Sequence, residues 1–337
     1  PARTAGALTV RVVGMEERAR DQPGLGSVLA PADWRVRWRR SLDLGDAVKP
    51  PVFSGGLVHV VTRAGKRVEA LDPASGKTRW SLDVSTYPGF RYAGGMLLLT
   101  GADGKVTGVD GASGATQWSR RIAGLSRPYF VSLPGSPSAL AVNVSQYGTR
   151  TRVTAVDGTT GDVRWDARLD GSLTPVGLTG GSVVFLSGDP SGSTANAVIR
   201  YNPETKVSRR VRLTVPLQTA QATLHGDLCP ILGTGGTVTL VDTAAGKQLW
   251  SLETSVSRGS APVTDGRFVY FTAADGRLLA VDAAEGRLLG QTSPRLSAQG
   301  SEFKPALPHP QAADPRLYAS APDGTVFAVD SREPSAW

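Results

Sequence analysis

The sequence predicts an all-β chain in which one four-stranded antiparallel unit is repeated seven times. The first observation is the repeat itself, because an acidic or amide residue recurs at intervals of 38 to 48 residues. These anchor residues are Asp72, Asp110, Asp157, Asn202, Asp242, Asp282 and Asp330. The second observation is that short alternating apolar runs between Gly-rich turns fill each interval, a pattern typical of hairpins. Repeats of about 40–45 residues with four strands each predict a seven-bladed β-propeller.

The first copy shows the expected elements in order. Strands are predicted at residues 51–54, 57–62, 67–72 and 78–83, with turns at 55–56, 64–65 and 73–76 between them. Later copies contain Asp-Gly pairs at 103–104, 265–266, 275–276 and 323–324. Asp-Gly favours tight hairpin turns because both positions need a positive φ. Each copy is therefore expected to fold as a meander of four strands.

A motif of Asp, then Gly four residues later and Trp eight residues later, marks the third and fourth strands. The carboxylate is expected to accept backbone N–H groups of the turn, and Gly supplies the positive φ that closes it. The Trp offers a flat surface for a neighbouring blade. We therefore expect structural docking roles, and no catalytic ones, for Asp72, Gly76, Trp80, Asp110, Gly114, Trp118, Asp157, Gly161, Trp165, Asp242, Gly246 and Trp250. Three copies deviate: one has Gly290 at the Trp position, another has Lys206 and Arg210 at the Gly and Trp positions, and the last has Pro334 at the Gly position and ends before the Trp position.

This motif, Ala-x-Asp-x-x-x-Gly-x-x-x-Trp, resembles the tryptophan-docking repeat of the PQQ-like β-propeller family. The resemblance covers residues 34–337 and rests on four complete copies. The family includes quinoprotein alcohol dehydrogenases, the lipoprotein subunit of the outer-membrane β-barrel assembly machine, and propeller domains of bacterial membrane kinases. The chain is most similar to the non-enzymatic branch, which implies a propeller that binds partners.

The two ends of the chain are expected to meet in one blade. The last copy ends seven residues after Asp330, so its fourth strand is short or missing. Residues 34–43 read WRVRWRRSLD and resemble the fourth strand of the first copy. Such a strand would complete the seventh blade and remove exposed edges. We therefore expect an N-terminal extension at residues 1–33 and the propeller at residues 34–337.

The residues that support metal or cofactor chemistry are scarce. The chain has three His and one Cys, Cys229, at no zinc-ligand spacing, and it has no calcium-loop motif. As the resemblance implies, quinoprotein dehydrogenases hold their quinone under adjacent cysteines with calcium and an Asp base. A lone cysteine does not match this pattern, so we expect no metal, no cofactor and no catalytic residue. A quinone-dependent dehydrogenase stays as an alternative.

Charge indicates where a partner could bind. The formal net charge is +8, but the arginines form only short runs in strand-like segments, so no nucleic-acid partner is expected.

Loops on a rigid scaffold usually carry function. The predicted binding face, with the turns between second and third strands and the links between blades, contains Lys49, Arg63, Lys66, Tyr87, Arg127, Tyr147, Arg150, Arg258 and Lys304. The acidic residues expected on the same face are Asp46, Asp103, Asp189, Asp275, Glu302 and Asp323. Lys49, Arg127, Arg258 and Lys304 are expected to converge on one mouth, and long loops at 132–138, 188–196 and 308–315 are a second candidate site.

These features together predict a non-catalytic binding or scaffold propeller outside the cytoplasm of a bacterium. Its partner would be a protein, a peptide or an anionic cell-wall ligand. No apolar run is long enough to span a bilayer, so an anchor would lie in a segment outside this sequence. The propeller would then be the sensory or interaction domain of a larger protein. An envelope assembly factor is the alternative, although the Arg- and Ala-rich composition favours an actinobacterial source.

Overall fold

The computed structural model describes Leu42 and residues 51–122, 130–133, 135–145, 147–189, 193–296, 309–313, 315–322 and 326–337. The predicted extension at 1–33 and all of the predicted closing strand at 34–43 except Leu42 lie outside this part. The chain forms two compact units that divide between Asp170 and Gly171. We call them the first and the second unit and describe each by itself.

The first unit contains three four-stranded antiparallel sheets, each paired in chain order. Sheet 1 consists of β1 (Val52–Ser54), β2 (Leu57–Thr62), β3 (Arg67–Leu71) and β4 (Thr78–Asp83). Sheet 2 consists of β5 (Gly89–Ala93), β6 (Met96–Thr100), β7 (Lys105–Asp110) and β8 (Thr116–Arg121). Sheet 3 consists of β9 (Phe130–Ser132), β10 (Ser138–Val144), β11 (Arg150–Asp157) and β12 (Val163–Asp170). A 3-10 turn, η2 (Arg63–Gly65), joins β2 to β3.

The second unit contains four more sheets with the same order of pairing. Sheet 4 consists of β13 (Ser172–Thr179), β14 (Ser182–Gly188), β15 (Thr194–Asn202) and β16 (Val207–Gln218). Sheet 5 consists of β17 (Gln221–Ala222), β18 (Leu228–Leu232), β19 (Thr237–Asp242) and β20 (Lys247–Glu253). Sheet 6 consists of β21 (Val263–Thr264), β22 (Phe268–Thr272), β23 (Leu278–Asp282) and β24 (Leu288–Gln291). Sheet 7 has three described strands, β25 (Gln311–Ala313), β26 (Arg316–Ser320) and β27 (Val326–Asp330), followed by the 3-10 turn η3 (Pro334–Ala336).

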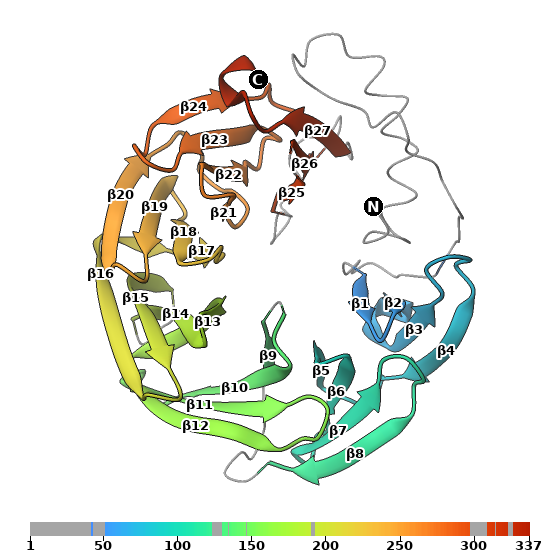
Figure 1. Ribbon diagram of the computed structural model, residues 1–337. Coiled ribbons are helices and arrows are strands. Elements are labelled where there is room, and N and C mark those ends of the chain that lie inside the picture. Colours follow the sequence, from blue (N-terminus) through green and yellow to red (C-terminus); the bar gives the residue numbers. More distant parts are fainter. Residues whose placement is uncertain are drawn as a thin grey trace. The chain divides into compact units, whose positions relative to one another are not determined.

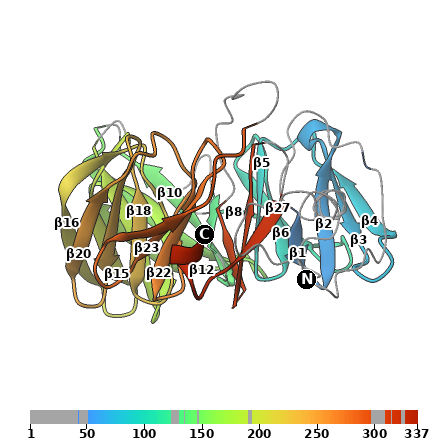
Figure 2. The ribbon, with the colours of Figure 1, turned by 90° about the horizontal axis from the view of Figure 1, so that it is seen from above.

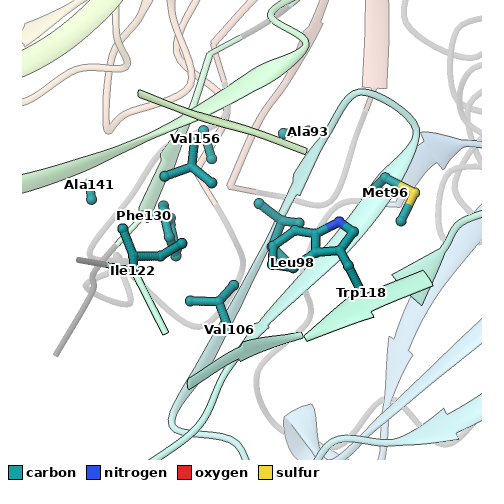
Figure 3. Packing of buried hydrophobic residues seen from close by; sticks show 10 residues of the cluster. Ala93, Met96, Leu98, Val106, Trp118, Ile122, Phe130, Ala141 and Val156 are labelled. Atoms are coloured by element: carbon teal, nitrogen blue, oxygen red, sulfur yellow. The ribbon is translucent and has the colours of Figure 1, made fainter. Parts of the chain in front are cut away.

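The hydrophobic core lies between successive sheets. Within the first unit, one cluster joins Met96, Leu98 and Trp118 of sheet 2 to Phe130 and Val156 of sheet 3, and Figure 3 shows these side chains together. Comparable clusters in the second unit join sheet 4 to sheet 5, sheet 5 to sheet 6 and sheet 6 to sheet 7. Within each unit, these clusters bury the apolar side chains of one sheet against the next.

The fourth strands lie at the edges of their sheets. The longest described strand is β16 with 12 residues, and it lies beside β20 of the next sheet in both views (Figures 1 and 2). The backbone N–H of Thr214 in β16 donates to Oε1 of Gln248 in β20 at 3.0 Å, and the Gln248 amide donates to Oγ1 of Thr214 at 2.8 Å. The Gln248 side chain of sheet 5 thus occupies the backbone N–H of Thr214 at the edge of sheet 4.

The predicted strands of the first copy match the observed strands within one residue, because both follow the same Gly turns. Leu42 packs against the cluster of Val58, Val60 and Leu71 in sheet 1. Among the described residues, no helix combines the length and the apolar character that crossing a membrane requires.

Candidate interaction surface

The anchor residues close the turn between the third and fourth strands of sheets 1 to 6. In sheet 1, Oδ1 of Asp72 accepts the backbone N–H groups of Ala74 and Ser75, both at 2.9 Å. These hydrogen bonds from Ser75 and Ala74 lower the pKa of Asp72 below its ordinary value. The same pair of bonds forms at Asp157, Asn202, Asp242 and Asp282. The anchor carboxylates are therefore engaged in their own turns.

A tryptophan of the fourth strand reaches the corresponding turn of the next sheet. The Nε1–H groups of Trp80, Trp118 and Trp250 donate to the backbone O of Gly111, Gly158 and Ala283 at 3.1, 2.9 and 2.8 Å. Each acceptor directly follows the anchor residue of the next sheet. The rings also lie over the motif glycines, so that a Cβ added at Gly114 would lie 2.7 Å from Cδ2 of Trp80. These contacts join successive sheets. They also occupy the N–H donors of these three indoles.

A bulge in the fourth strand sets the position of each tryptophan. In sheet 1, Ala70 pairs with Trp80 and Leu71 pairs with Thr78, so Arg79 is the extra residue. The same shift precedes Trp118, Trp165, Trp250 and Gly290. A β-bulge turns the strand locally and re-aims the side chain beside it. The repeated bulge is therefore the local device that directs the ring to the next sheet.

Sheet 4 lacks this bulge, which corrects the alignment expected from the sequence. Arg200 pairs with Arg209, so Arg209 takes the Trp position that the motif spacing assigns to Arg210. Cδ of Arg209 lies 2.8 Å from a Cβ added at Gly246, and its Nη1 donates to the backbone O of Ala244. Lys206 takes the glycine position with a φ of 60°. A guanidinium thus stands where the other sheets have an indole.

The predicted binding face corresponds to one end of the sheets. We call this end the turn rim: it carries the turn between second and third strands and the link to the next sheet. Arg63 and Lys66 lie on the turn rim of sheet 1, and both are exposed. Arg63 and Ala64 have φ values of 53° and 52°, a conformation that non-glycine residues rarely adopt. This backbone projects Arg63 from a sharp, well-defined turn.

Tyr87 contributes to packing more than to the surface of the rim. It lies in the link between β4 and β5, where its ring is half-buried against the cluster of Val68, Val84, Leu97, Leu99 and Val109. Its backbone N–H donates to the O of Val84 at 3.1 Å. The sequence placed Tyr87 correctly on the rim, but its ring packs between sheets 1 and 2.

Tyr147 and Arg150 lie on the turn rim of sheet 3. Tyr147 is 73% exposed in the β10–β11 turn, the largest exposure among the exposed large apolar side chains of the described residues. Arg150 starts β11, and its Nε lies 3.6 Å from Oδ1 of Asp170. An exposed aromatic side chain next to a guanidinium suits contact with a protein partner.

The acidic side chains on the turn rim of the first unit have cationic neighbours. Hydrogen bonds from Ser85 lower the pKa of Asp83, and the charges of Arg67 and Arg63 add to this effect. Arg121 binds Asp103, with Nη1 at 2.5 Å from its backbone O and Nη2 at 3.3 Å from Oδ2. Sequence reasoning missed Arg121 and its strand partner Lys105, although Lys105 follows an Asp-Gly turn much as Lys66 follows Gly65.

The remaining predicted site residues are divided between the second unit and undescribed segments. Arg258 is half-buried in the β20–β21 link of the second unit, and its backbone O accepts the N–H of Ala274 at 2.9 Å. Lys49, Arg127 and Lys304, with Asp46, Glu302 and Asp323, lie outside the described residues, so the predicted convergence of cations stays a prediction. Asp189 and Asp275 lie on the turn rim of the second unit.

Two of the long loops differ from the expectation. Residues 132–138 form the β9–β10 turn, which lies at the opposite end of sheet 3 from the turn rim. Residues 308–315 contain the strand β25, because Gln311–Ala313 pairs with β26. Residues 188–196 do connect β14 to β15 on the turn rim.

The described residues contain no group of three or more His, Cys, Asp or Glu side chains that could hold a metal ion. Cys229 is buried in β18, and burial raises the pKa of its thiol to about 12. A thiol with so high a pKa is a poor nucleophile at neutral pH. What this part of the molecule offers chemically is a set of cationic and aromatic contacts on the turn rim.

Comparison with known proteins gives the fold and the family. The crystal structure of BamB from Moraxella catarrhalis is similar with a TM-score of 0.55 and 20% identity, over 86% of this chain and 84% of that chain. The computationally designed Ika8 protein is similar with a TM-score of 0.50 and 17% identity, over 86% of this chain and 98% of that chain. No curated protein matches the sequence significantly. The predicted β-propeller class is confirmed, while the count of seven blades stays a prediction.

The family model that matches the sequence is a PQQ-repeat model described as outer membrane protein assembly factor BamB. The match extends over residues 21–210 and 234–336, which is most of the chain. It includes the anchors and tryptophans whose contacts are described above. The chain therefore belongs to the PQQ-repeat β-propeller family that this BamB model defines.

Proposed function

We propose that this chain is a non-catalytic binding propeller of the bacterial envelope, working outside the cytoplasm, whose turn rim binds an acidic segment of a protein partner. The family description, an outer membrane protein assembly factor, supports a protein-binding role in the envelope. An anchor in a segment outside this sequence would hold the propeller at the membrane.

The charge balance of the turn rim in the first unit carries the proposal. Asp83, Asp103 and Asp170 each have an arginine nearby, as described above. The side chains of Lys66 and Lys105 are exposed and have no hydrogen bond or ion pair within the described part of the chain. Both precede or begin the third strand of their sheet. The rim therefore offers cations that its own carboxylates do not occupy.

The spacing of these cations suits an extended acidic segment. Sheets 1 and 2 pack face to face, so Lys105 lies about 10 Å from its counterpart Arg67, which Lys66 directly precedes. In an extended peptide, residues three apart are separated by a similar distance, about 10 Å. Tyr147 adds an exposed aromatic ring on the same rim of the first unit. Carboxylates at every third residue could thus reach both lysines.

The single cysteine supports the non-catalytic part of the proposal. As the family resemblance implies, the quinone enzymes of this family use adjacent cysteines, whereas this chain has only Cys229, which lies buried in β18. A quinone-dependent activity would appear as stoichiometric quinone binding in the presence of calcium, and that result would contradict this part.

The test uses a fluorescent deca-glutamate peptide as the probe and the whole chain as the receptor. We expect binding that weakens with salt, and a dissociation constant at least about fivefold higher in the Lys66→Glu/Lys105→Glu variant. The matched control is Lys77→Glu/Lys247→Glu, which makes the same charge change at the opposite end of sheets 1 and 5, where Lys77 precedes β4 and Lys247 begins β20. Equal weakening in both variants would mean non-specific charge attraction and would overturn the rim as the site.

A second probe separates the partner classes. Soluble polygalacturonate carries carboxylates on a glycan, so binding of this polymer without binding of the peptide would replace the protein partner by a cell-wall ligand. Localisation is tested separately by fusing alkaline phosphatase, which is active only outside the cytoplasm, to the full open reading frame. An inactive but stable fusion would contradict the envelope location.

A further inference from the structure

Strand β24 of sheet 6 lacks the side chain that joins the other sheets to their neighbours. Gly290 pairs with Ala280 and follows the bulged Leu289, so it has the register of Trp80, Trp118 and Trp250. The rest of the arrangement is preserved, because the anchor Asp330 of sheet 7 is present. Sheet 6 therefore has a docking position with no indole of its own.

The 3-10 turn η3 fills the space beside Gly290. Pro334 is buried, and its backbone lies so close to Gly290 that an added Cβ would lie 2.7 Å from the Pro334 carbonyl carbon and closer still to its oxygen. The backbone N–H of Ala336 donates to the O of Glu333 at 3.0 Å, which closes the turn. Position 290 thus cannot carry a side chain while the turn is in place.

Trp337 brings an indole to this place from the other direction. Its ring stacks on Tyr270 of β22, with the centroids 5.9 Å apart and the planes at 25°. Its Nε1–H donates to the backbone O of Asp330 at 2.9 Å. Trp337 packs against the cluster between sheets 6 and 7, together with Val263 and Phe268. The ring is held by stacking, by a hydrogen bond and by apolar contact.

Tyr270 supplies the hydrogen bond that a tryptophan at position 290 would make. Its hydroxyl lies 3.2 Å from the backbone O of Ser331 and 3.2 Å from Oδ2 of Asp265, two acceptors that share its single proton. Ser331 follows the anchor Asp330, just as Gly111, Gly158 and Ala283 follow theirs. Tyr270 itself is fully buried. The two tasks of a docking tryptophan, the hydrogen bond and the aromatic surface, are divided here between Tyr270 and Trp337.

We propose that residues 333–337 form a strap that fills an indole-binding groove on sheet 6, made by Tyr270, Phe268 and Gly290. The groove holds one indole, which comes either from position 290 or from Trp337. When the strap is absent, the groove binds a short peptide that carries the same sequence. This inference is independent of the proposed partner on the turn rim.

The first test moves the indole from position 337 to position 290 and measures the melting temperature of the chain. Removing residues 333–337 should lower it by about 4–8 °C, because an aromatic contact is lost. Gly290→Trp in the intact chain should also lower it, because the new side chain conflicts with Pro334. Combining the two changes should give a higher melting temperature than either change alone. Additive losses in the combined variant would overturn the proposal.

The matched control is Gly89→Trp, because a Cβ at Gly89 has no atom within 4 Å. Combined with strap removal, it should give no recovery. Full-chain variants keep the test valid if the shortened chain does not fold: Trp337→Phe should keep most of the stability and Trp337→Ala should lose it. Equal melting temperatures for these two variants would show that the ring contributes nothing.

The second test asks whether the groove binds its strap as a separate ligand. The synthetic peptide SREPSAW, residues 331–337, should raise the melting temperature of the chain that lacks residues 333–337, in proportion to the logarithm of its concentration. The same peptide with Ala in place of Trp should not. The SREPSAW peptide should have no effect on the melting temperature of the intact chain, because residues 333–337 already fill its groove. Absence of a shift with SREPSAW would contradict a binding groove.

Discussion

Two junctions in the second unit, sheet 5 with sheet 6 and sheet 4 with sheet 5, join equivalent turns with different chemistry. At the first, the indole of Trp250 covers Gly286 and its Nε1–H donates to Ala283. At the second, the Arg209 methylenes cover Gly246 and its guanidinium donates to Ala244. The backbone of the receiving turn is the same in both, with Gly246 and Gly286 at φ values of 69° and 68°.

The difference shows which features the junction requires. Trp250 and Arg209 each place apolar atoms over a glycine, the ring in one case and the methylenes in the other. Each also donates a hydrogen bond to a backbone carbonyl of the turn. The polar junction has a second layer, in which Nη1 of Arg200 donates to Oδ1 of Asp227 at 2.6 Å and Thr179 donates to the same oxygen at 3.0 Å. The Arg209 guanidinium is exposed, and exposed charged contacts contribute little to stability. The indole junction should therefore hold its sheets more strongly.

The largest effect that tests this comparison is expected for Trp250→Ala. The substitution should reduce the free energy of unfolding of the chain by about 3 kcal/mol, because it removes a large contact surface and leaves the Ala283 carbonyl without the indole donor. Urea unfolding followed by circular dichroism measures the change. Trp250→Phe is the control, since it keeps a ring and loses the donor, and it should cost less. A loss below about 1 kcal/mol for Trp250→Ala would show that the ring is not needed.

A smaller effect is expected at the guanidinium junction. Arg209→Ala should reduce the free energy of unfolding of the chain by about 1 kcal/mol, because water can partly replace the exposed guanidinium as the donor to Ala244. Arg209→Met keeps the methylenes over Gly246 and should recover part of the loss. If Arg209→Ala costs as much as Trp250→Ala in the same urea experiment, the two junctions are equivalent and the comparison fails.

The smallest effect concerns a third junction, in which a histidine shares the acceptor of a tryptophan. His59 Nε2 and Trp80 Nε1 both donate to the O of Gly111, at 2.8 and 3.1 Å, and the His59 ring lies 5.0 Å from that of Trp80. Burial lowers the pKa of His59 below 6.5. The unfolded chain therefore takes up this proton at a higher pH than the folded chain does.

Stability contributed at His59 is consequently present above pH 6.5 and is lost as the pH falls below that value. His59→Gln should weaken the fall in the melting temperature of the chain between pH 7.5 and 5.5, while keeping an amide donor near Gly111. His225→Gln, which changes a histidine of the second unit, is the control and should leave this fall unchanged. An identical pH dependence for His59→Gln and the original chain would exclude His59 as its source.

Strand positions and turns could be predicted from the sequence because they depend on neighbouring residues. Alternation and Gly turns located β1 to β4 within one residue, and the motif located the tryptophans. The role of Arg209 could not be found by spacing, because sheet 4 lacks one bulged residue and only strand register shows this. Trp337 and Tyr270 join through contacts 67 positions apart, for which the sequence has no local signal. The half-buried ring of Tyr87 likewise depends on packing between two sheets.

The hydrogen bonds between Thr214 and Gln248 have a consequence for self-association. A long edge strand such as β16 presents backbone groups that can template the strand of another molecule, which is a common start of aggregation. Gln248 occupies one of these groups, and Arg209, Arg210 and Arg212 place charge along the rest of the strand. A second copy that approached this edge would have to displace the amide and bring like charges together. The longest edge described in the molecule is thereby also one that resists stacking into fibres.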